Sequence, residues 1–588
     1  MCGIIAVIRR PSHRAVPTRD DILGLVSGTA GDLEGIALEQ ADGPLAKVAE
    51  RLATADTLLR GTPGLRLLLS DPGLTDSLRA ELKSLNAHLD DLETDLDAKA
   101  TVDSLDLEAV NSQLIAARDG AWAIERDRLR AAEVVSDLGG RGVHDAGIDA
   151  IFSVHQALSA IDRMEVRGRD SAGLHLLVSN HGLDLDDETV AAAIEARIEK
   201  TELFTDSAVR RVGDRLSFVY KVAAEIGELG DNTASLRDSI RKDSLLRRAL
   251  DNSTAEVVVI GHTRWASVGI VSEPNAHPVN SDQTSEKSGP YCTAVLNGDV
   301  DNYGDLIRSE ELCIADDITT DTKVIPTLTS KHLDQGHDIT EAFRRAVSVF
   351  EGSVAIGLSS EEAPNDLLLA LRGSGQSIYV GLAEDSYIVA SEPYGVVEET
   401  TDYVRMDGET PANPDNPSAS RGQILRLSGE HAGDIAGIHR VGYDGTELPV
   451  TDVDVSIAEV TTRDIDRGDY KHYLLKEISE SPRSFRKTLR GKLVESNGRF
   501  TVTVPESTMP AHVAERISSG QIKNIYVIGQ GTAAVAGQAV AASIIDEVDG
   551  QINVQAIAAT ELSGFGLRKD MSDSLIIAIS QSLSLIHI

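Results

Sequence analysis

The first residue of the chain that could do covalent chemistry is Cys2, in the sequence Met1-Cys2-Gly3-Ile4. Removal of the initiator methionine would leave a first residue that carries both a thiol and an α-amine. The amine, with a free pKa near about 8, can accept the thiol proton and make Cys2 a nucleophile with its own base. Taken alone, such a cysteine is more often a small buried thiol. Motifs elsewhere in the chain are needed to distinguish a nucleophile from a buried structural thiol.

Five short motifs follow Cys2 along the chain. They are Met-Glu-Val-Arg-Gly-Arg-Asp-Ser-Ala-Gly-Leu at 164–174, Gly-His-Thr-Arg-Trp-Ala-Ser-Val-Gly at 261–269, Asn-Ala-His-Pro at 275–278, Leu-Asn-Gly-Asp-Val-Asp-Asn-Tyr at 296–303 and Thr-Thr-Asp-Thr-Lys-Val at 319–324. Their residue types suit attack on the side-chain amide of glutamine. The resulting oxyanion needs fixed hydrogen-bond donors, which an Asn amide and a Gly backbone N–H can supply. An arginine can grip the α-carboxylate in fork geometry, and an aspartate can pair with the α-ammonium.

This ordered set closely resembles the class II, N-terminal-nucleophile glutamine amidotransferases, and among them the glutamine:fructose-6-phosphate aminotransferases. The resemblance implies Cys2 as nucleophile, with Asn297 and Gly298 as oxyanion donors. It also implies a set of glutamine-binding residues: Arg264 on the carboxylate, Asp321 on the ammonium, Arg167 near the nucleophile's amine, Trp265 as the gate of the ammonia passage, and Ser267.

Each motif also has a structural interpretation. Asn297-Gly298 could be a hairpin turn, and Asp321, between two threonines, could cap a helix. Arg264 could form a surface ion pair, and Trp265 could belong to the core. His277 is expected to be structural, because the α-amine already supplies the base.

A second group of motifs lies near the end of the chain. Residues 471–492 resemble the segment that opens the sugar isomerase (SIS) part of the same aminotransferases. Gly529-Gln530-Gly531-Thr532 follows an apolar run, and a Gly-rich turn before a helix presents backbone N–H groups to a phosphate. Ser580-Gln581-Ser582 matches the family's second phosphate loop. The resemblance thus implies sugar-phosphate binding by Thr532, Ser580, Gln581 and Ser582.

The chain departs from the family pattern in three places. Val268 replaces the usual histidine, and Ala533 replaces a serine that would bind phosphate. After Ser582 the sequence reads Leu-Ser-Leu-Ile-His-Ile, where the family continues through two SIS domains. We therefore expect a C-terminally truncated fragment that acts as a glutaminase, while the full-length parent, a homodimer, passes ammonia to fructose 6-phosphate. Two alternatives stay open: a non-catalytic sugar-phosphate sensor, and a different class II amidotransferase.

The elements that must position these residues can be predicted from the pattern. Apolar runs at 2–8, 257–261, 294–302, 353–358, 367–371 and 377–391 indicate strands. Two regions, about 18–140 and 187–252, look like helical insertions, and leucines from Leu78 to Leu96 follow heptad spacing. The predicted fold is an α+β N-terminal-nucleophile αββα sandwich with a helical insertion, followed by a partial α/β SIS domain. The predicted domains are residues 1–455, a linker and helix at 456–502, and the incomplete SIS domain at 503–588.

The composition excludes some partners. The formal net charge of −37 argues against nucleic acid and against anionic membranes. Three cysteines make no disulfide framework, and no signal peptide is visible, so we expect a cytoplasmic protein. The uncharged stretch 525–545 is interrupted by glycines and glutamines and fits a strand, a turn and a helix better than a membrane span. No metal or organic cofactor is implied; the expected small-molecule partners are glutamine and fructose 6-phosphate.

Overall fold

The computed structural model describes residues 2–98, 107–139, 145–201, 203–223, 228–252, 254–284, 289–373, 375–412, 419–490, 492–496, 499–502, 506 and 508–580. They form two compact units. The first is built from residues up to Thr488 and the second from residues beginning at Leu489. The mixed α and β content predicted from the sequence is confirmed.

The first unit contains a nine-stranded antiparallel sheet in which the N-terminal strand is central. The strand order is β15-β12-β10-β11-β1-β5-β2-β4-β3. The strands are β1 Gly3–Arg9, β2 Ser171–Ser179, β3 Val209–Val212, β4 Arg215–Ala223, β5 Glu256–Arg264, β10 Tyr379–Leu382, β11 Ser386–Ala390, β12 Asp402–Arg405 and β15 Val455–Ile457. Because β1 pairs with β11 on one side and β5 on the other, the start of the chain is fixed from both sides.

A second, six-stranded antiparallel sheet has the order β14-β13-β9-β8-β7-β6. Its strands are β6 Val279–Asn280, β7 Cys292–Gly298, β8 Val354–Ser360, β9 Ala363–Arg372, β13 Gln423–Ser428 and β14 Ile438–Gly442. Apart from the short β6, these strands are connected largely as a meander, with β7, β8 and β9 paired in sequence order.

The two sheets share one apolar core. Along β1, Ile4, Ala6 and Ile8 join a cluster with residues of the second sheet such as Val295 and Leu369. Their neighbours Ile5 and Val7 pack with helices on the opposite face. Side chains of a strand alternate between its two faces, so a fully apolar strand must be buried on both. This accounts for the unbroken apolar run at the N-terminus.

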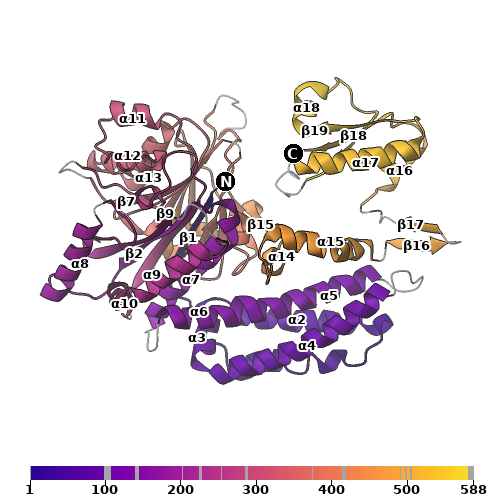
Figure 1. The fold of residues 1–588 in the computed structure, drawn as a ribbon, viewed down its shortest axis with the longest axis horizontal. Coiled ribbons are helices and arrows are strands. Elements are labelled where there is room, and N and C mark those ends of the chain that lie inside the picture. The colour runs from indigo at the N-terminus through magenta and orange to yellow at the C-terminus, as the bar shows by residue number, and fades with distance from the viewer. Residues whose placement is uncertain are drawn as a thin grey trace. The chain divides into compact units, whose positions relative to one another are not determined.

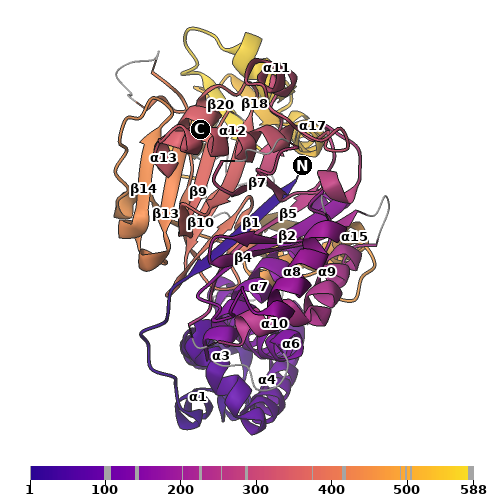
Figure 2. The same ribbon diagram turned by 90° about the vertical axis from the view of Figure 1, so that its left-hand side faces the viewer.

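Helices cover the outer faces of both sheets. Three of them pack on the six-stranded sheet: α11 Tyr303–Ser309, α12 Val324–Asp334 and α13 Ile339–Ser348 (Figure 2). The nine-stranded sheet is covered by α7, Asp145–Met164, which contacts β1 and β5, and by α9, Asp231–Lys242. Within the described residues of this unit, the layers are therefore helix, sheet, sheet, helix.

The region predicted as a long helical insertion, about 18–140, is helical where described. It forms α1 Arg19–Val26, α2 Asp42–Leu59, α3 Gly61–Ser70, α4 Pro72–Ala98, α5 Leu107–Trp122, a π-helical turn at Ala123–Leu129 and α6 Arg130–Gly139 (Figure 1). The heptad leucines of α4 are all buried. They pack with α1, α3 and α5, so the repeat marks a helical bundle inside the unit.

A buried ionic cluster ties this bundle to the sheets. Arg128 of the π-helical turn bonds Asp56 of α2 at 2.8 Å, and it also bonds Glu399 and the carbonyl oxygen of Glu398, which follow β11. All four side chains are buried. A buried charge without partners is strongly destabilising, so this cluster fixes how the bundle sits on the sheet.

The second predicted helical insertion, about 187–252, was only partly right. Helices α8 Glu188–Lys200, α9 and α10 Ser244–Leu250 lie in it, but so do strands β3 and β4, which form the edge of the nine-stranded sheet. The reason is visible in Arg-Leu-Ser-Phe-Val-Tyr-Lys-Val-Ala at 215–223: β-branched and aromatic residues alternate with polar ones, which favours a strand. Leu216, Phe218 and Tyr220 enter the helix-facing core.

The second unit is a small α/β body. A hairpin of β16 Leu493–Ser496 and β17 Arg499–Val502 precedes α16 Ala511–Ser518. Then β18 Asn524–Gly529 lies between β19 Asn553–Ala558 and β20 Ser574–Ala578 in a parallel sheet, with α17 Thr532–Val548 crossing over. The predicted parallel βαβ arrangement is confirmed, and the stretch 525–545 is a strand, a turn and a helix. Nowhere in the described residues is there a helix long and apolar enough to cross a membrane.

Candidate active site

Cys2 lies directly before β1, beside the end of the neighbouring strand β5. Because Gly3 pairs with Thr263, Cys2 is brought next to Arg264 and the residue that follows it. The backbone N–H of Trp265 donates to Cys2 Sγ at 3.2 Å. Burial raises the pKa of the Cys2 thiol, while the Trp265 N–H and the Arg264 charge act in the opposite direction. The thiol therefore needs a base to become a nucleophile, but a donor already supports its sulfur.

Asn297 reaches Cys2 from the other sheet. Its amide Nδ2 donates to the Cys2 carbonyl oxygen at 3.0 Å, and its Oδ1 lies 3.0 Å from His262 Nε2. His262 is fully buried on β5, and burial lowers its pKa to about 3. It is thus neutral, and its Nε2–H is the donor to Asn297. An amide carries two N–H groups, so one remains for a group bound at the sulfur.

Gly298 ends β7 with φ +91°, a left-handed conformation. A Cβ at this position would lie 1.9 Å from the carbonyl oxygen of Ser353 on the adjacent chain segment. Only glycine fits both the backbone angle and the space. Asn297 and Gly298 are strand residues paired with Ala355 and Val354, so the hairpin-turn interpretation is wrong.

Arg264 is buried at the end of β5, so the surface ion-pair interpretation is also wrong. Its guanidinium donates to the carbonyl oxygen of Ile270 at 3.3 Å and to that of Val268. These bonds fold the 265–271 loop around it. Burial lowers the pKa of Arg264, and nearby Cys2 and Asp321 counteract that shift. A guanidinium has five N–H donors, so further donors remain for a ligand carboxylate.

Asp321 is buried and faces the same region. It is the first residue of a 3-10 turn, Asp321–Lys323, and its Oδ2 accepts the backbone N–H of Val300 at 2.7 Å. It is therefore not the cap of a helix. Burial, joined by Asp299, raises the pKa of Asp321 to about 6. Ser267 donates to Asp299 at 2.6 Å. A carboxylate held in this way can receive a ligand ammonium.

The remaining predicted residues of this region fall on its margin. Trp265 is 61% exposed and so is not a core residue. Arg167 pairs with Glu392 at 2.9 Å. The turn that carries it lies against β5, because a Cβ on Gly168 would be 2.6 Å from the backbone of Arg264. His277 is buried and bonds Thr320 and Thr322, in keeping with a structural role.

Three supporting residues were not identified from the sequence. Asp170 accepts the N–H of Ala266 at 2.8 Å, Asp299 accepts from Ser267, and His262 orients Asn297. All three lie inside the motifs that revealed the site. Their positions in those motifs were the available signal, but their partners Ala266, Ser267 and Asn297 belong to other segments of the chain and could not be predicted from the local sequence.

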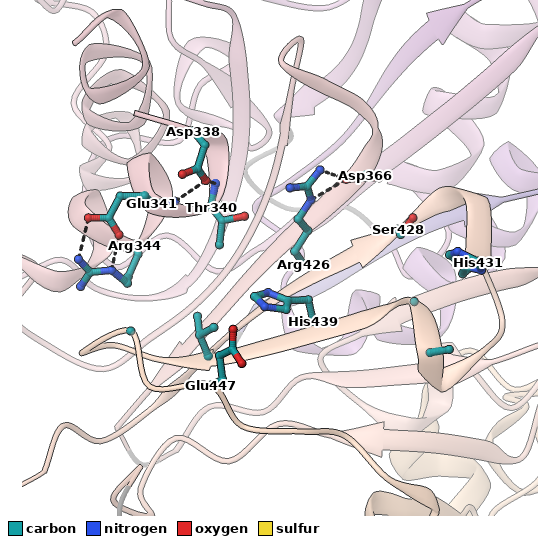
Figure 3. Close-up of a pocket in the computed structure, with 14 residues that line it drawn as sticks. Asp338, Thr340, Glu341, Arg344, Asp366, Arg426, Ser428, His431, His439 and Glu447 are labelled. Carbon is teal, nitrogen blue, oxygen red and sulfur yellow. Dashed lines mark hydrogen bonds and ion pairs between the residues drawn. The ribbon is translucent and has the colours of Figure 1, made fainter. Parts of the chain in front are cut away.

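A separate hollow of the first unit lies elsewhere. About 630 Å³ in volume, it lies over the six-stranded sheet between α13, β13 and β14, and no predicted site residue lines it (Figure 3). Four of its charged side chains form ion pairs: Arg426 with Asp366, and Arg344 with Glu341. Asp338 accepts backbone N–H groups at the start of α13. This hollow has no link to the cysteine.

The predicted sugar-phosphate residues lie in the second unit. Thr532 is the first residue of α17, after Gly531 with φ +57°. Ser580 follows β20, whose neighbour in the sheet is β18, so the turns after these strands share one edge. Gln581 and Ser582 lie outside the described residues.

Known proteins resemble the chain over about half its length, and no protein-family model matches it. The sequence relatives are glutamine-dependent aminotransferases. In particular, they are named glutamine–fructose-6-phosphate aminotransferase [isomerizing], and the resemblance predicted from the motifs is confirmed. The Bacillus licheniformis enzyme is 31% identical over 293 residues, 50% of this chain and 42% of the relative. The Oceanobacillus iheyensis enzyme is 30% identical over 361 residues, 61% of this chain and 53% of the relative. The chain thus spans about half the length of the curated relatives it matches.

Two solved structures are also similar. One is the glutamine phosphoribosylpyrophosphate amidotransferase from B. subtilis, complexed with ADP and GMP, at 14% identity and TM-score 0.31 over 74% of this chain and 68% of that chain. The other is described as the allosteric regulatory enzyme of purine biosynthesis, at 14% identity and TM-score 0.32 over 72% of this chain and 87% of that chain.

Proposed function

We propose that the first unit is an N-terminal-nucleophile glutaminase of the αββα type and that Cys2 is its nucleophile. The observation that carries the proposal is the convergence at one point of residues from β1, β5 and β7. Cys2 Sγ, the Trp265 N–H, the Asn297 amide and the Arg264 guanidinium meet there, with Asp321 behind them. A nucleophile, oxyanion donors, a cation and an anion are what glutamine hydrolysis requires.

The proposed reaction proceeds as follows. After removal of Met1, the α-amine of Cys2 takes the thiol proton, and the thiolate attacks the side-chain carbonyl carbon of glutamine. The second N–H of Asn297 and the backbone at Gly298 stabilise the oxyanion. The amine returns the proton to the leaving group, ammonia departs and a thioester forms. Water then attacks the thioester to release glutamate. Arg264 and Asp321 hold the α-carboxylate and α-ammonium, Ser267 supports their loop, and Arg167 orders the region of the amine.

In this proposal, the second unit binds the sugar phosphate that accepts the ammonia. Its parallel sheet and the Gly-rich turn before α17 resemble an SIS sugar-phosphate domain, with Thr532, Ser580, Gln581 and Ser582 as phosphate ligands. In the full-length parent, a homodimer, ammonia would pass by Trp265 to fructose 6-phosphate and form glucosamine 6-phosphate. The names of the sequence relatives support this acceptor.

The deciding experiment measures glutamate release from glutamine by the purified chain, together with the intact mass of its N-terminus. Cys2→Ala is the test variant. Cys313→Ala is the matched control, because Cys313 is an exposed thiol outside the site. We expect a mass without Met1, glutamate release by wild type and by Cys313→Ala, and none by Cys2→Ala. A retained Met1, or equal activity in both variants, would refute the assignment. A folded, processed and inactive wild type would favour the sugar-phosphate sensor.

A further inference from the structure

A second cavity of the first unit, about 360 Å³ in volume, lies apart from the cysteine site. Its walls come from the end of α5, the π-helical turn at Ala123–Leu129, helices α6, α7 and α9, and the chain segment 462–473. Ligand pockets in proteins usually measure about 300 to 1,000 Å³. π-Helical turns are rare and often occur at functional sites. The size and the irregular wall both suit a small molecule.

Arginines outnumber acidic residues by five to four in the lining of this cavity, in a chain whose net charge is −37. Five of its lining residues are arginines: Arg126, Arg130, Arg163, Arg237 and Arg467. Its lining acids are Asp127, Asp162, Glu398 and Asp466. Arg163 is committed to Glu398, at 2.7 Å. Burial, joined by the nearby Glu398 charge, raises the pKa of Asp127 to about 7, which removes part of its negative charge at neutral pH.

Three side chains at this cavity hold buried polar atoms without hydrogen-bond partners. They are the indole Nε1 of Trp122, the guanidinium Nη1 of Arg237 and both ring nitrogens of His155. Burial lowers the pKa of His155 to about 3, so its imidazole is neutral and offers one N–H. A buried donor left without a hydrogen bond is destabilising. Three donors without a hydrogen bond face one hollow, although His155 Nε2 lies 3.8 Å from Glu398 Oε1, and together they indicate an occupant rich in acceptors.

We propose that this cavity binds the phosphate group of a small phosphorylated metabolite. Its donors come from three separate elements: Trp122 from α5, His155 from α7 and Arg237 from α9. A tetrahedral phosphate accepts hydrogen bonds from several directions, whereas a planar carboxylate accepts them mainly in its plane. Guanidinium groups favour phosphate through paired N–H bonds. The site is separate from the proposed glutaminase and does not depend on it.

The test titrates inorganic phosphate into the full chain and follows heat release, with sodium chloride at matched ionic strength as reference. Arg237→Gln is the main variant. Arg241→Gln is the matched control, since Arg241 lies one turn further along α9 and pairs with Asp137 and Asp238 outside the cavity. We expect Arg237→Gln to raise the phosphate Kd about tenfold or more, and Arg241→Gln to leave it unchanged.

A second variant covers the case in which Arg237→Gln does not fold. Arg126 is exposed at the cavity and its guanidinium lies 5.4 Å from the centre of the Trp122 ring, so Arg126→Gln should fold and weaken phosphate binding. The chain has two tryptophans. Trp265→Phe therefore leaves Trp122 as the sole reporter, and we expect phosphate to change its fluorescence. The proposal fails if phosphate acts no more strongly than chloride, if acetate binds as tightly, or if Arg126→Gln binds phosphate as Arg241→Gln does.

Discussion

Substitution of Gly298 by alanine tests whether the end of β7 must be glycine for both stability and activity. The new Cβ would lie 1.9 Å from Ser353 O, whereas ordinary contact begins at 3.4 Å. The two segments must therefore separate by about 1.5 Å, because carbon and oxygen cannot overlap. This separation breaks the bond from the Asp299 N–H to Ser353 O, 3.3 Å long. Its loss costs about 1 kcal/mol.

The backbone angle adds a second cost. At φ +91° a residue with a Cβ is strained by about 1–2 kcal/mol. Together with the lost bond, we expect Gly298→Ala to lower the free energy of unfolding by about 2–3 kcal/mol. The shift also moves Asn297, and displacement of a catalytic group by about 1 Å can cost about a hundredfold in rate.

Gly336→Ala separates the two effects. Gly336 follows α12 with φ +87°, and no atom lies within 4 Å of its would-be Cβ. It should show only the strain of about 1–2 kcal/mol and full glutaminase activity. Both variants are compared by urea unfolding, followed by circular dichroism, and by glutamate release. If they lose equal stability and Gly298→Ala keeps its activity, the steric reasoning is refuted.

Three further outcomes can be checked. Because the pKa of Asp321 is raised to about 6, its carboxyl is charged above pH 6 and becomes neutral below it. The KM for glutamine should therefore rise about tenfold per pH unit below pH 6. In Asp321→Asn the KM should be high and independent of pH from 5 to 8. Arg128→Met removes the cation that bonds buried Glu399 and one of the two that bond Asp56, which keeps Arg60 at 2.7 Å. Chemical denaturation should show a loss of about 3–5 kcal/mol, while unchanged stability would disprove the role of the cluster. Leu85→Ala in α4 should cost about 2–5 kcal/mol in the same assay, against less than about 0.5 for the exposed Lys83→Ala.

The sequence was most informative where short motifs end strands. Cys2 lies directly before β1, Arg264 ends β5 and Asn297 lies next to the end of β7, and strand pairing brings them together. The apolar run at residues 4–8 predicted a buried strand because both of its faces are covered. The leucines of α4 predicted helix packing, because apolar residues that recur with the helical period lie on one face of the helix.

Features that depend on partners distant in sequence could not be predicted. The Arg128 cluster joins residues 72 and 271 positions apart, and nothing near Arg128 shows which acids it meets. Strands β3 and β4 lie in the region 187–252, for which the acidic, alanine-rich segments around them predict helix. The alternation of apolar and polar residues in β4 forms a strand because β4 pairs with β2, and a strand near the edge of a sheet is stabilised by its neighbour.

The link between His262, Asn297 and Cys2 shows how the fold can set the chemistry of the site. A neutral His262 that donates through Nε2 fixes the amide oxygen of Asn297 on its own side. The amide nitrogen must then face Cys2, where it bonds the backbone carbonyl oxygen. The reverse orientation would place two oxygens against each other, at a cost the buried setting makes large. The buried histidine thus selects the orientation of Asn297 in which the amide nitrogen faces Cys2, and it does so from β5, the strand that also ends in Arg264.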